Sequence, residues 1–340
     1  MDKRLETRSH IGVEQDDFLG PGFKALALNS KDEQICTLVH FQNRKKAQSD
    51  QQPIAILYVH GYTDYFHQTE QANFFNSLGL DFYAVDLHGY GRSIRPFQHD
   101  HNKNSFSNYF ADLDVCLQTM ASRGVQSCII LGHSTGGLIV SRYLSKVYQR
   151  DSLGINIIGL ILNSPFLSLP MPLNQERWRL PLYRFISRSL SGISLPANKN
   201  TLYAQSIHKS LGGEWPYRLD WKPSQGSPLS FSWLNHIMRE QRTCLQSSCD
   251  IPTLLCRSSH SSYAKKTLAE AQQGDAVLDV DNMEAKAKTI FTQLDIVIIN
   301  KGFHDLALSP SEVRHDYYKK IQSWLSTYQN IQKETSYSSN

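Results

Sequence analysis

One short segment places a serine between an expected strand and an expected helix. Residues 127–131 are mostly apolar and β-prone, and they run into Gly132-His133-Ser134-Thr135-Gly136, a Gly-x-Ser-x-Gly pattern. A buried helix is predicted to follow, from Thr135 to Tyr148. A strand, a sharp turn with a serine and a helix form a nucleophile elbow, which exposes the hydroxyl at the end of a sheet. Ser134 is therefore the candidate nucleophile. The backbone N–H of Thr135, at the helix N-terminus, is a candidate oxyanion donor.

A histidine near the C-terminus is the candidate base. Residues 294–299 predict a last strand, which is followed by Gly302-Phe303-His304-Asp305 and by a polar helix from about Ser311 to Tyr328. A histidine just past a final strand can reach over the carboxyl edge of the sheet and accept the proton of an elbow serine. Among the thirteen histidines, His304 is the one that has this context.

The acid of a catalytic triad is expected between the last two strands. Residues 251–256 predict the first of these strands, but no aspartate follows at once, and residues 257–274 form a polar insertion. Asp275 then opens a loop before an expected helix, and it is the preferred acid. Asp279 is the alternative, and its other role would be to cap that helix. Asp305 is the least favoured acid, because it directly follows His304 and the side chains of adjacent loop residues rarely face each other.

The second oxyanion donor is expected after an early strand. Residues 53–59 predict that strand, and His60-Gly61-Tyr62 follows it. The N–H of Tyr62 is the expected donor beside that of Thr135, and His60 is expected to brace the loop by hydrogen bonding. The Gly-rich segment 86–93 lacks the Gly-x-Gly-x-x-Gly spacing of a nucleotide site, so it predicts a structural turn, tied by Asp86 and Arg92.

Strands and helices alternate between Ile54 and Leu162, which predicts an α/β protein with a mostly parallel central sheet and helices on both faces. The alternation then breaks in a stretch rich in Trp, Tyr, Pro and Gly, which holds four of the five tryptophans. Such an insertion over the carboxyl edge would form a cap, with its aromatic side chains in its own small core or facing the serine. The predicted division is a core in two parts (1–163 and 251–330), a cap (164–250) and a frayed polar tail (331–340).

These segments together resemble the α/β-hydrolase superfamily. The matching residues are His60-Gly61-Tyr62, residues 86–93, residues 132–137 and Gly302-Phe303-His304-Asp305. More narrowly, the chain resembles the group of monoacylglycerol lipases, lysophospholipases and S33 serine aminopeptidase-like proteins, over roughly Phe23 to Tyr328. The resemblance implies the α/β-hydrolase fold and a serine hydrolase that cleaves a lysophospholipid, a monoacylglycerol or a similar acyl ester through an acyl-enzyme. In that group the acid usually follows its strand directly, in a Gly-x-x-Asp turn, and the insertion before Asp275 departs from this pattern.

Two other functions are open from the sequence. An aminopeptidase or amidase of the S33 type would need a carboxylate in the cap to hold a free α-amine, and Glu176, Glu214 and Asp220 are available. A binding protein of the same fold that does not catalyse would typically have lost a member of the triad. Because Ser134 and His304 are both present, this second alternative is disfavoured.

Composition limits the partners. Hydrophobic residues make up 40% of the 340-residue chain and charged residues 19%, as in ordinary globular proteins. The formal net charge is only +4 and the basic residues are scattered, so we expect no nucleic-acid partner. The densest basic group is interpreted as a solvated face, or alternatively as a patch for phosphate or for transient contact with a membrane surface: Arg177, Arg179, Arg184 and Arg188.

Neither a transmembrane segment nor a signal peptide is expected, since no run of about 18 apolar residues occurs and the first residues lack an apolar core. Six cysteines occur singly, which indicates a reducing, cytoplasmic location. His99 and His101 flank Asp100, but two loop histidines without further ligands rarely hold a metal. We expect no metal, no cofactor and a lipid-like or other small acyl ester as substrate.

Overall fold

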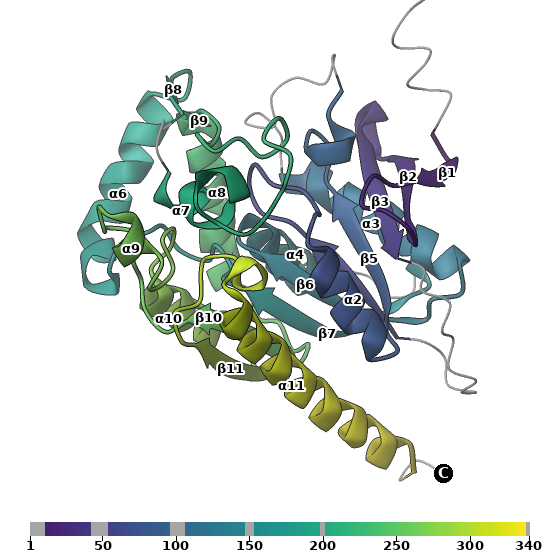
Figure 1. The fold of residues 1–340 in the computed structure, drawn as a ribbon. Coiled ribbons are helices and arrows are strands. Elements are labelled where there is room, and N and C mark those ends of the chain that lie inside the picture. Colours follow the sequence, from purple (N-terminus) through teal and green to yellow (C-terminus); the bar gives the residue numbers. More distant parts are fainter. Residues whose placement is uncertain (1–10, 42–53, 96–105, 147–152, 198–200, 338–340) are drawn as a thin grey trace, which may run out of the picture.

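The computed structural model describes residues 11–41, 54–95, 106–146, 153–197 and 201–337. Its centre is a nine-stranded sheet of the order β1-β2-β3-β5-β4-β6-β7-β10-β11 (Figure 1). The strands are β1 (Glu14–Asp16), β2 (Phe23–Asn29), β3 (Ile35–Phe41), β4 (Ile54–Val59), β5 (Asp81–Asp86), β6 (Ser127–His133), β7 (Asn156–Asn163), β10 (Thr253–Ser258) and β11 (Leu294–Ile299).

The sheet is parallel in the part that carries the predicted site. The pairs from β5 through β4, β6, β7 and β10 to β11 are all parallel, whereas β1, β2 and β3 join the other edge in antiparallel pairs. Parallel strands end at one edge, so the segments that follow β4, β6 and β11 are brought to the same side of the molecule. The predicted α/β class with a mostly parallel sheet is confirmed.

Helices cover both faces of the sheet and close two hydrophobic cores. One core holds side chains from α3 (Phe106–Ser122), α4 (Thr135–Lys146) and α10 (Val280–Ile290). The other, on the opposite face, holds side chains from α2 (Thr69–Ser77) and α11 (Ser311–Tyr337). The inner strands β4, β6, β7 and β10 are buried almost throughout, so their residues are apolar in runs and do not alternate with polar ones, whereas the edge strand β11 is partly exposed.

Two predicted boundaries shift in the structure. The pattern of residues 282–291 predicts a helix that starts near Asn282, but α10 begins at Val280, because Asp279 caps it by accepting a hydrogen bond from the N–H of Asn282 at 2.9 Å. Helix α11 runs past the expected end at Tyr328 to Tyr337, since no Gly or Pro interrupts it, and so takes up most of the predicted tail.

The segment between β7 and β10 leaves the sheet and gathers to one side of it (Figure 1). It contains α6 (Leu173–Ser189), β8 (Ser194–Leu195), α7 (Leu202–Ile207), β9 (Leu229–Ser230) and α8 (Phe231–Leu245). Helix α8 joins this segment to the core: Trp233 and Ile237 are buried in the first core, and Glu240 pairs with Arg142 of α4 at 3.0 Å. Helix α6 packs on α8, but Ser187 is its only buried residue.

Candidate active site

Ser134 sits in the sharp turn between β6 and α4. Its φ of +50° lies in the left-handed region, which is strained for a residue with a side chain. Two close approaches explain the flanking glycines. A Cβ at Gly136 would overlap the carbonyl oxygens of Val59 and His60, and a Cβ at Gly132 would lie 2.7 Å from Val140 Cγ2. The turn thus holds the serine hydroxyl out from the backbone at the end of the sheet.

Ser134, His304 and Asp275 form one hydrogen-bonded chain. The Nε2 of His304 lies 2.9 Å from Ser134 Oγ, and its Nδ1 lies 3.0 Å from Asp275 Oδ2. A carboxylate can only accept, so the proton of the neutral imidazole is on Nδ1 and Nε2 is left to accept from the serine hydroxyl. All three side chains are buried, and Asp275 is fully so. The sequence-predicted residues are therefore brought together in the geometry of a triad.

The backbone fixes the carboxylate of Asp275. Its Oδ1 accepts hydrogen bonds from the N–H groups of Val277 and Leu278, both at 2.8 Å, which leaves Oδ2 for His304. The alternative acids have other contacts. Asp279 caps α10, and Asp305 accepts hydrogen bonds from Asn163 at 2.8 Å and from Gln68 at 2.9 Å.

The loop after β4 lies against Ser134. A Cβ at Gly61 would be 3.1 Å from Ser134 Cβ, so the N–H of the next residue, Tyr62, is held close to the elbow. His60 accepts the N–H of Leu87 at Nε2 and donates from Nδ1 to the carbonyl of Gly61 at 2.7 Å. Burial lowers the pKa of His60, which keeps the ring neutral and able to do both. The expected bracing role of His60 is confirmed.

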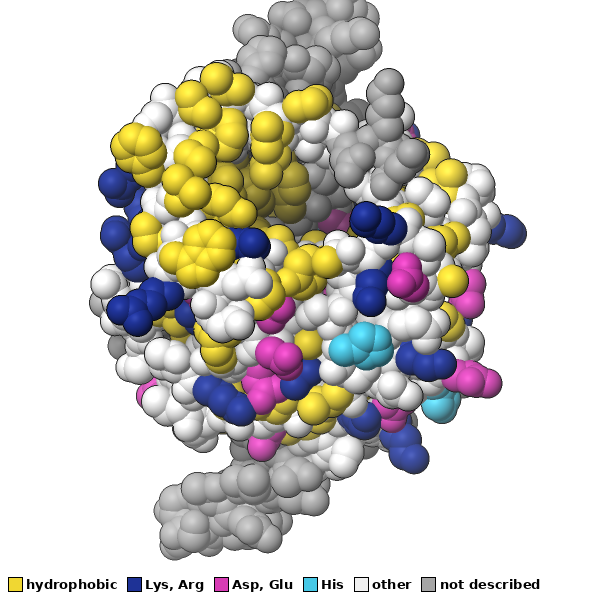
Figure 2. Space-filling model, turned by 90° about the vertical axis from the view of Figure 1, so that its left-hand side faces the viewer, with side chains coloured by type: hydrophobic (Ala, Val, Ile, Leu, Met, Phe, Trp, Pro, Cys, Tyr) yellow, Lys and Arg dark blue, Asp and Glu magenta, His cyan; other side chains and the backbone are white. Residues whose placement is uncertain are grey.

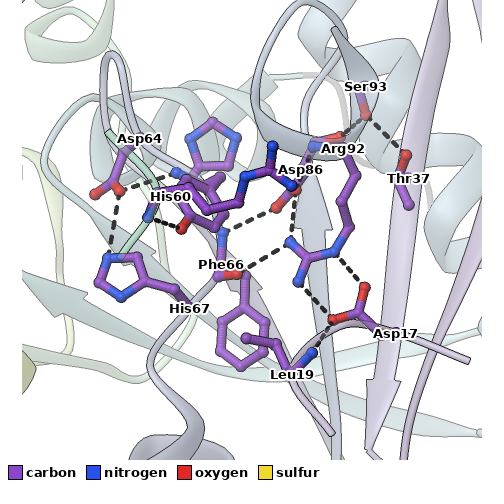
Figure 3. Close-up of polar contacts among 12 residues, drawn as sticks. Asp17, Leu19, Thr37, His60, Asp64, Phe66, His67, Asp86, Arg92 and Ser93 are labelled. Carbon is purple, nitrogen blue, oxygen red and sulfur yellow. Dashed lines mark hydrogen bonds and ion pairs between the residues drawn. The ribbon is translucent and has the colours of Figure 1, made fainter. Parts of the chain in front are cut away.

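A second brace lies below this loop, in the turn after β5 (Figure 3). Arg92 Nη1 binds Asp86 Oδ2 at 2.8 Å, and its other nitrogens form a fork on Asp17. Asp86 also accepts the backbone N–H of Phe66 at 2.8 Å. The predicted tie between Asp86 and Arg92 is confirmed, and through Phe66 it anchors the segment that follows β4.

Ser134 and His304 open into a cavity of about 780 Å³. One part of its wall is apolar and comes mainly from the inserted segment: Phe166, Leu169, Met171, Leu202, Leu229, Trp233, Leu234, Val277 and Leu278. Another part is polar: Thr63, Asp64, Tyr203, Tyr217 and Lys222. The ring of Trp233 packs on that of Tyr62, with 4.3 Å between centroids, so α8 contacts the loop after β4 directly. Tyr62 and Thr135, the expected oxyanion donors, both line this cavity.

The sequence did not predict a cluster of buried charged residues that lies at the polar part of the cavity wall. Lys222 Nζ lies 2.8 Å from Asp64 Oδ1. One atom each of Asp64, His133 and Asp305 lie within 4.8 Å of one another. Burial alone would raise the pKa of Asp305, but His133, Lys222 and two amide hydrogen bonds outweigh it, and the pKa falls below its usual value. Both carboxylates are thus already bound to N–H donors.

Several sequence candidates lie away from the cavity. Glu176 pairs with Lys286, and the exposed carboxylates of Glu214 and Asp220 pair with arginines. Of the tryptophans in the insertion, Trp233 lines the cavity, whereas Trp178 is 59% exposed to solvent. Residues 99–101 lie outside the described residues.

Known proteins resemble this chain both in sequence family and in fold. The model of the family described as serine aminopeptidase, S33, matches residues 51–306, three quarters of the chain. No curated protein matches it significantly. A soluble variant of the Saccharomyces cerevisiae monoglyceride lipase superposes with a TM-score of 0.60 at 15% identity, over 86% of this chain and 92% of that one.

Two further structures share the fold. The monoacylglycerol lipase of Paleococcus ferrophilus has a TM-score of 0.55 at 17% identity, over 81% of this chain and 94% of that one. An esterase from Exiguobacterium antarcticum has a TM-score of 0.55 at 15% identity, over 88% of this chain and 98% of that one. These similarities show the α/β-hydrolase fold that the sequence resemblance implied.

Proposed function

The chain belongs to the serine aminopeptidase S33 family of α/β-hydrolases, and from this premise we propose that it is a serine hydrolase of acyl esters. The observation that carries the proposal is the chain of contacts from Ser134 through His304 to Asp275, at the wall of a large, partly apolar cavity. A lysophospholipid, a monoacylglycerol or a similar ester is the proposed substrate.

The reaction follows from the positions of the groups. Ser134 Oγ attacks the ester carbonyl while its proton passes to His304 Nε2, and Asp275 stabilises the imidazolium that forms. The N–H groups of Tyr62 and Thr135 are the proposed donors to the oxyanion. His304 returns the proton to the alcohol oxygen as the ester bond breaks, which leaves an acyl-serine. A water molecule then attacks this acyl group with His304 again as base, and releases the carboxylic acid and Ser134.

The wall of the cavity supports an ester with an apolar acyl part and a polar alcohol part. The apolar side chains of residues 166–171 and 229–234 offer a surface on which an acyl chain would leave water. Elsewhere in the cavity lining, the hydroxyls of Thr63, Tyr203 and Tyr217 are buried and make no hydrogen bond with the described residues. Such groups are stabilised when a polar alcohol part binds there.

An aminopeptidase is the second candidate, and the cavity wall gives it less support. Binding a free α-amine needs an unpaired carboxylate near the serine. Asp64 is the only Asp or Glu among the described cavity-lining residues, and Lys222 already pairs with it at 2.8 Å. The complete triad geometry argues against a binding protein without catalysis.

The proposal includes the division of the chain and its location. Residues 164–250 are proposed to act as a cap, inserted between two parts of one core, 1–163 and 251–330. A cytoplasmic location is supported by all six cysteines being free and buried. None of the helices in the described ranges combines the length and the apolar character that crossing a bilayer needs.

A matched substrate panel tests this function. The p-nitrophenyl esters of acetic, octanoic and palmitic acid, a monoacylglycerol and a lysophosphatidylcholine are compared with aminoacyl p-nitroanilides, using wild type and Ser134→Ala. We expect turnover of esters that is lost in Ser134→Ala, with anilides cleaved at least roughly 100-fold less efficiently. Efficient cleavage of the anilides would make the protein an aminopeptidase. Equal activity in both proteins would remove Ser134 from the mechanism.

A further inference from the structure

Helix α6 and the turn after it expose an unusual amount of apolar surface. Eight of the fourteen large hydrophobic side chains that are exposed in the described residues lie between Leu173 and Leu195. Phe185 is 70% exposed and Trp178 59%. Figure 2 shows hydrophobic side chains gathered on this side of the molecule, next to a hollow. We call this surface, residues 173–195, the α6 face. Contiguous apolar patches on globular proteins mark sites of interaction.

The α6 face is amphipathic in a particular way. Trp178, Leu182 and Phe185 are spaced by four and three residues, which places them in one row along the helix. Arg177 and Arg188 are both exposed, and their spacing of eleven residues, about three helical turns, places them in one row beside the apolar row. Apolar side chains beside arginines are typical of helices that lie in the interface of a lipid bilayer.

The net charge of the α6 face is positive. It carries four arginines and a single acid, Glu176, which is already paired with Lys286 at 2.8 Å. An exposed surface with this excess of positive charge attracts anionic groups. A second copy of the chain would fit poorly, because a two-fold contact brings the same arginines of both copies together.

The α6 face also adjoins the cavity. Tyr183 belongs to α6 and is 37% exposed to solvent, and it lines the same cavity as Ser134. A molecule that left an apolar layer at the α6 face would therefore meet the cavity wall at Tyr183.

We propose that the α6 face docks the protein on an anionic lipid surface. Trp178, Leu182 and Phe185 enter the boundary between head groups and acyl chains, and the arginines contact lipid phosphates. The docking needs no catalysis. Its benefit to the turnover of lipid esters rests on the proposed function.

Co-sedimentation with phosphatidylcholine vesicles, with and without phosphatidylglycerol, tests the docking. The variants are Trp178→Glu/Phe185→Glu and Arg177→Gln/Arg188→Gln, and the control is Val13→Glu, whose side chain is 52% exposed outside the α6 face. Wild type and the control should bind the anionic vesicles, and either double variant should bind at least roughly tenfold more weakly. Added salt should weaken wild-type binding. Because every changed side chain is exposed, hydrolysis of a dissolved acetyl ester should be equal in all four proteins.

Three outcomes would overturn the docking. Wild type could fail to bind anionic vesicles, or both double variants could bind as well as wild type. Light scattering could also reveal a wild-type dimer that Trp178→Glu/Phe185→Glu abolishes, which would make a second copy the occupant. Binding of Ser134→Ala to vesicles separates this test from the reaction: intact binding with no hydrolysis in wild type would refute the proposed function and leave the docking in place.

Discussion

Replacing Asp275 by Asn should abolish turnover while the fold survives, and the contacts of Asp275 explain why. The Oδ1 of Asp275 accepts two backbone N–H groups. Asn must keep its carbonyl oxygen there, since turning its NH₂ group towards them would leave two buried donors unsatisfied at about 1–3 kcal/mol each. Its NH₂ group therefore faces His304 Nδ1, which has to become an acceptor. The ring proton moves to Nε2 and points at Ser134, which can no longer pass its proton to the histidine.

The wrong tautomer of His304 determines how much turnover Asp275→Asn loses. In a well-studied serine protease the same change costs about 10⁴ in kcat, which corresponds to about 5 kcal/mol of transition-state stabilisation. We expect a similar loss for Asp275→Asn in a burst-corrected assay with an octanoyl ester. Its melting temperature should stay close to that of wild type, because both backbone hydrogen bonds remain.

Asp279→Asn is the matched control. Asn caps a helix as well as Asp does, so this variant should keep both its turnover and its stability. If Asp275→Asn keeps kcat within tenfold of wild type, or if Asp279→Asn is the inactive folded variant, the assignment of the acid is refuted.

Three further changes probe the cavity, the sheet and the elbow. Leu234→Trp should lower kcat/KM for palmitoyl esters by roughly tenfold or more and leave kcat/KM for acetyl esters unchanged. The exposed Trp178→Ala should change kcat/KM for neither ester when the substrate is dissolved. Parallel losses on both esters in Leu234→Trp would contradict the proposal that the apolar part of the cavity wall holds the acyl chain. Burial lowers the pKa of His40 to about 4 in the folded protein. As the pH falls below 6.5, His40 is therefore protonated in the unfolded chain before it is protonated in the folded one. The free energy of unfolding should fall by up to about 3 kcal/mol between pH 6.5 and 4. In urea titrations, the free energy of unfolding of His40→Gln should decline less between these pH values than that of wild type. An equal decline in both proteins would contradict a role of His40 in this pH dependence. Gly136→Ala should cost about 3 kcal/mol or more in urea unfolding, and Gly192→Ala, in open space, almost nothing; equal stabilities would refute the close packing of the elbow.

The sequence predicted the local parts of the site well. Strand β11 has the bounds that periodicity indicates, and the elbow around Ser134 follows from a few adjacent residues. These features depend on neighbours along the chain, where glycine positions and apolar runs carry the information.

The position of the acid was harder to predict because it depends on how residues 257–274 return to the sheet. In the structure a bridge pairs Ser261 with Asp275, and the N–H of Asp275 donates to the carbonyl of His260 at 3.0 Å. This contact brings the end of the insertion back beside β10, so Asp275 reaches the place where a short turn would have put an acid. No local pattern in the insertion encodes that pairing.

The packing of the proposed cap and of the charged cluster depends on residues that are far apart in the sequence. Trp178 and Trp233 lie in the same aromatic-rich insertion, and only tertiary packing decides that one is exposed and the other lines the cavity. Lys222 and Asp64 pair across 158 positions of sequence. A lysine directly after Trp221 in an aromatic stretch was the one signal that a cation is buried there.

Covalent labelling of Ser134 tests the central claim most directly. The protein is treated with a fluorophosphonate, and the modified residue is located by mass spectrometry of its peptides. We predict a single adduct on Ser134, no adduct on Ser134→Ala, and labelling that slows by roughly 10³-fold or more in His304→Ala, because the base no longer takes the serine proton. An adduct on another residue, or labelling of Ser134→Ala at the wild-type rate, would contradict the account.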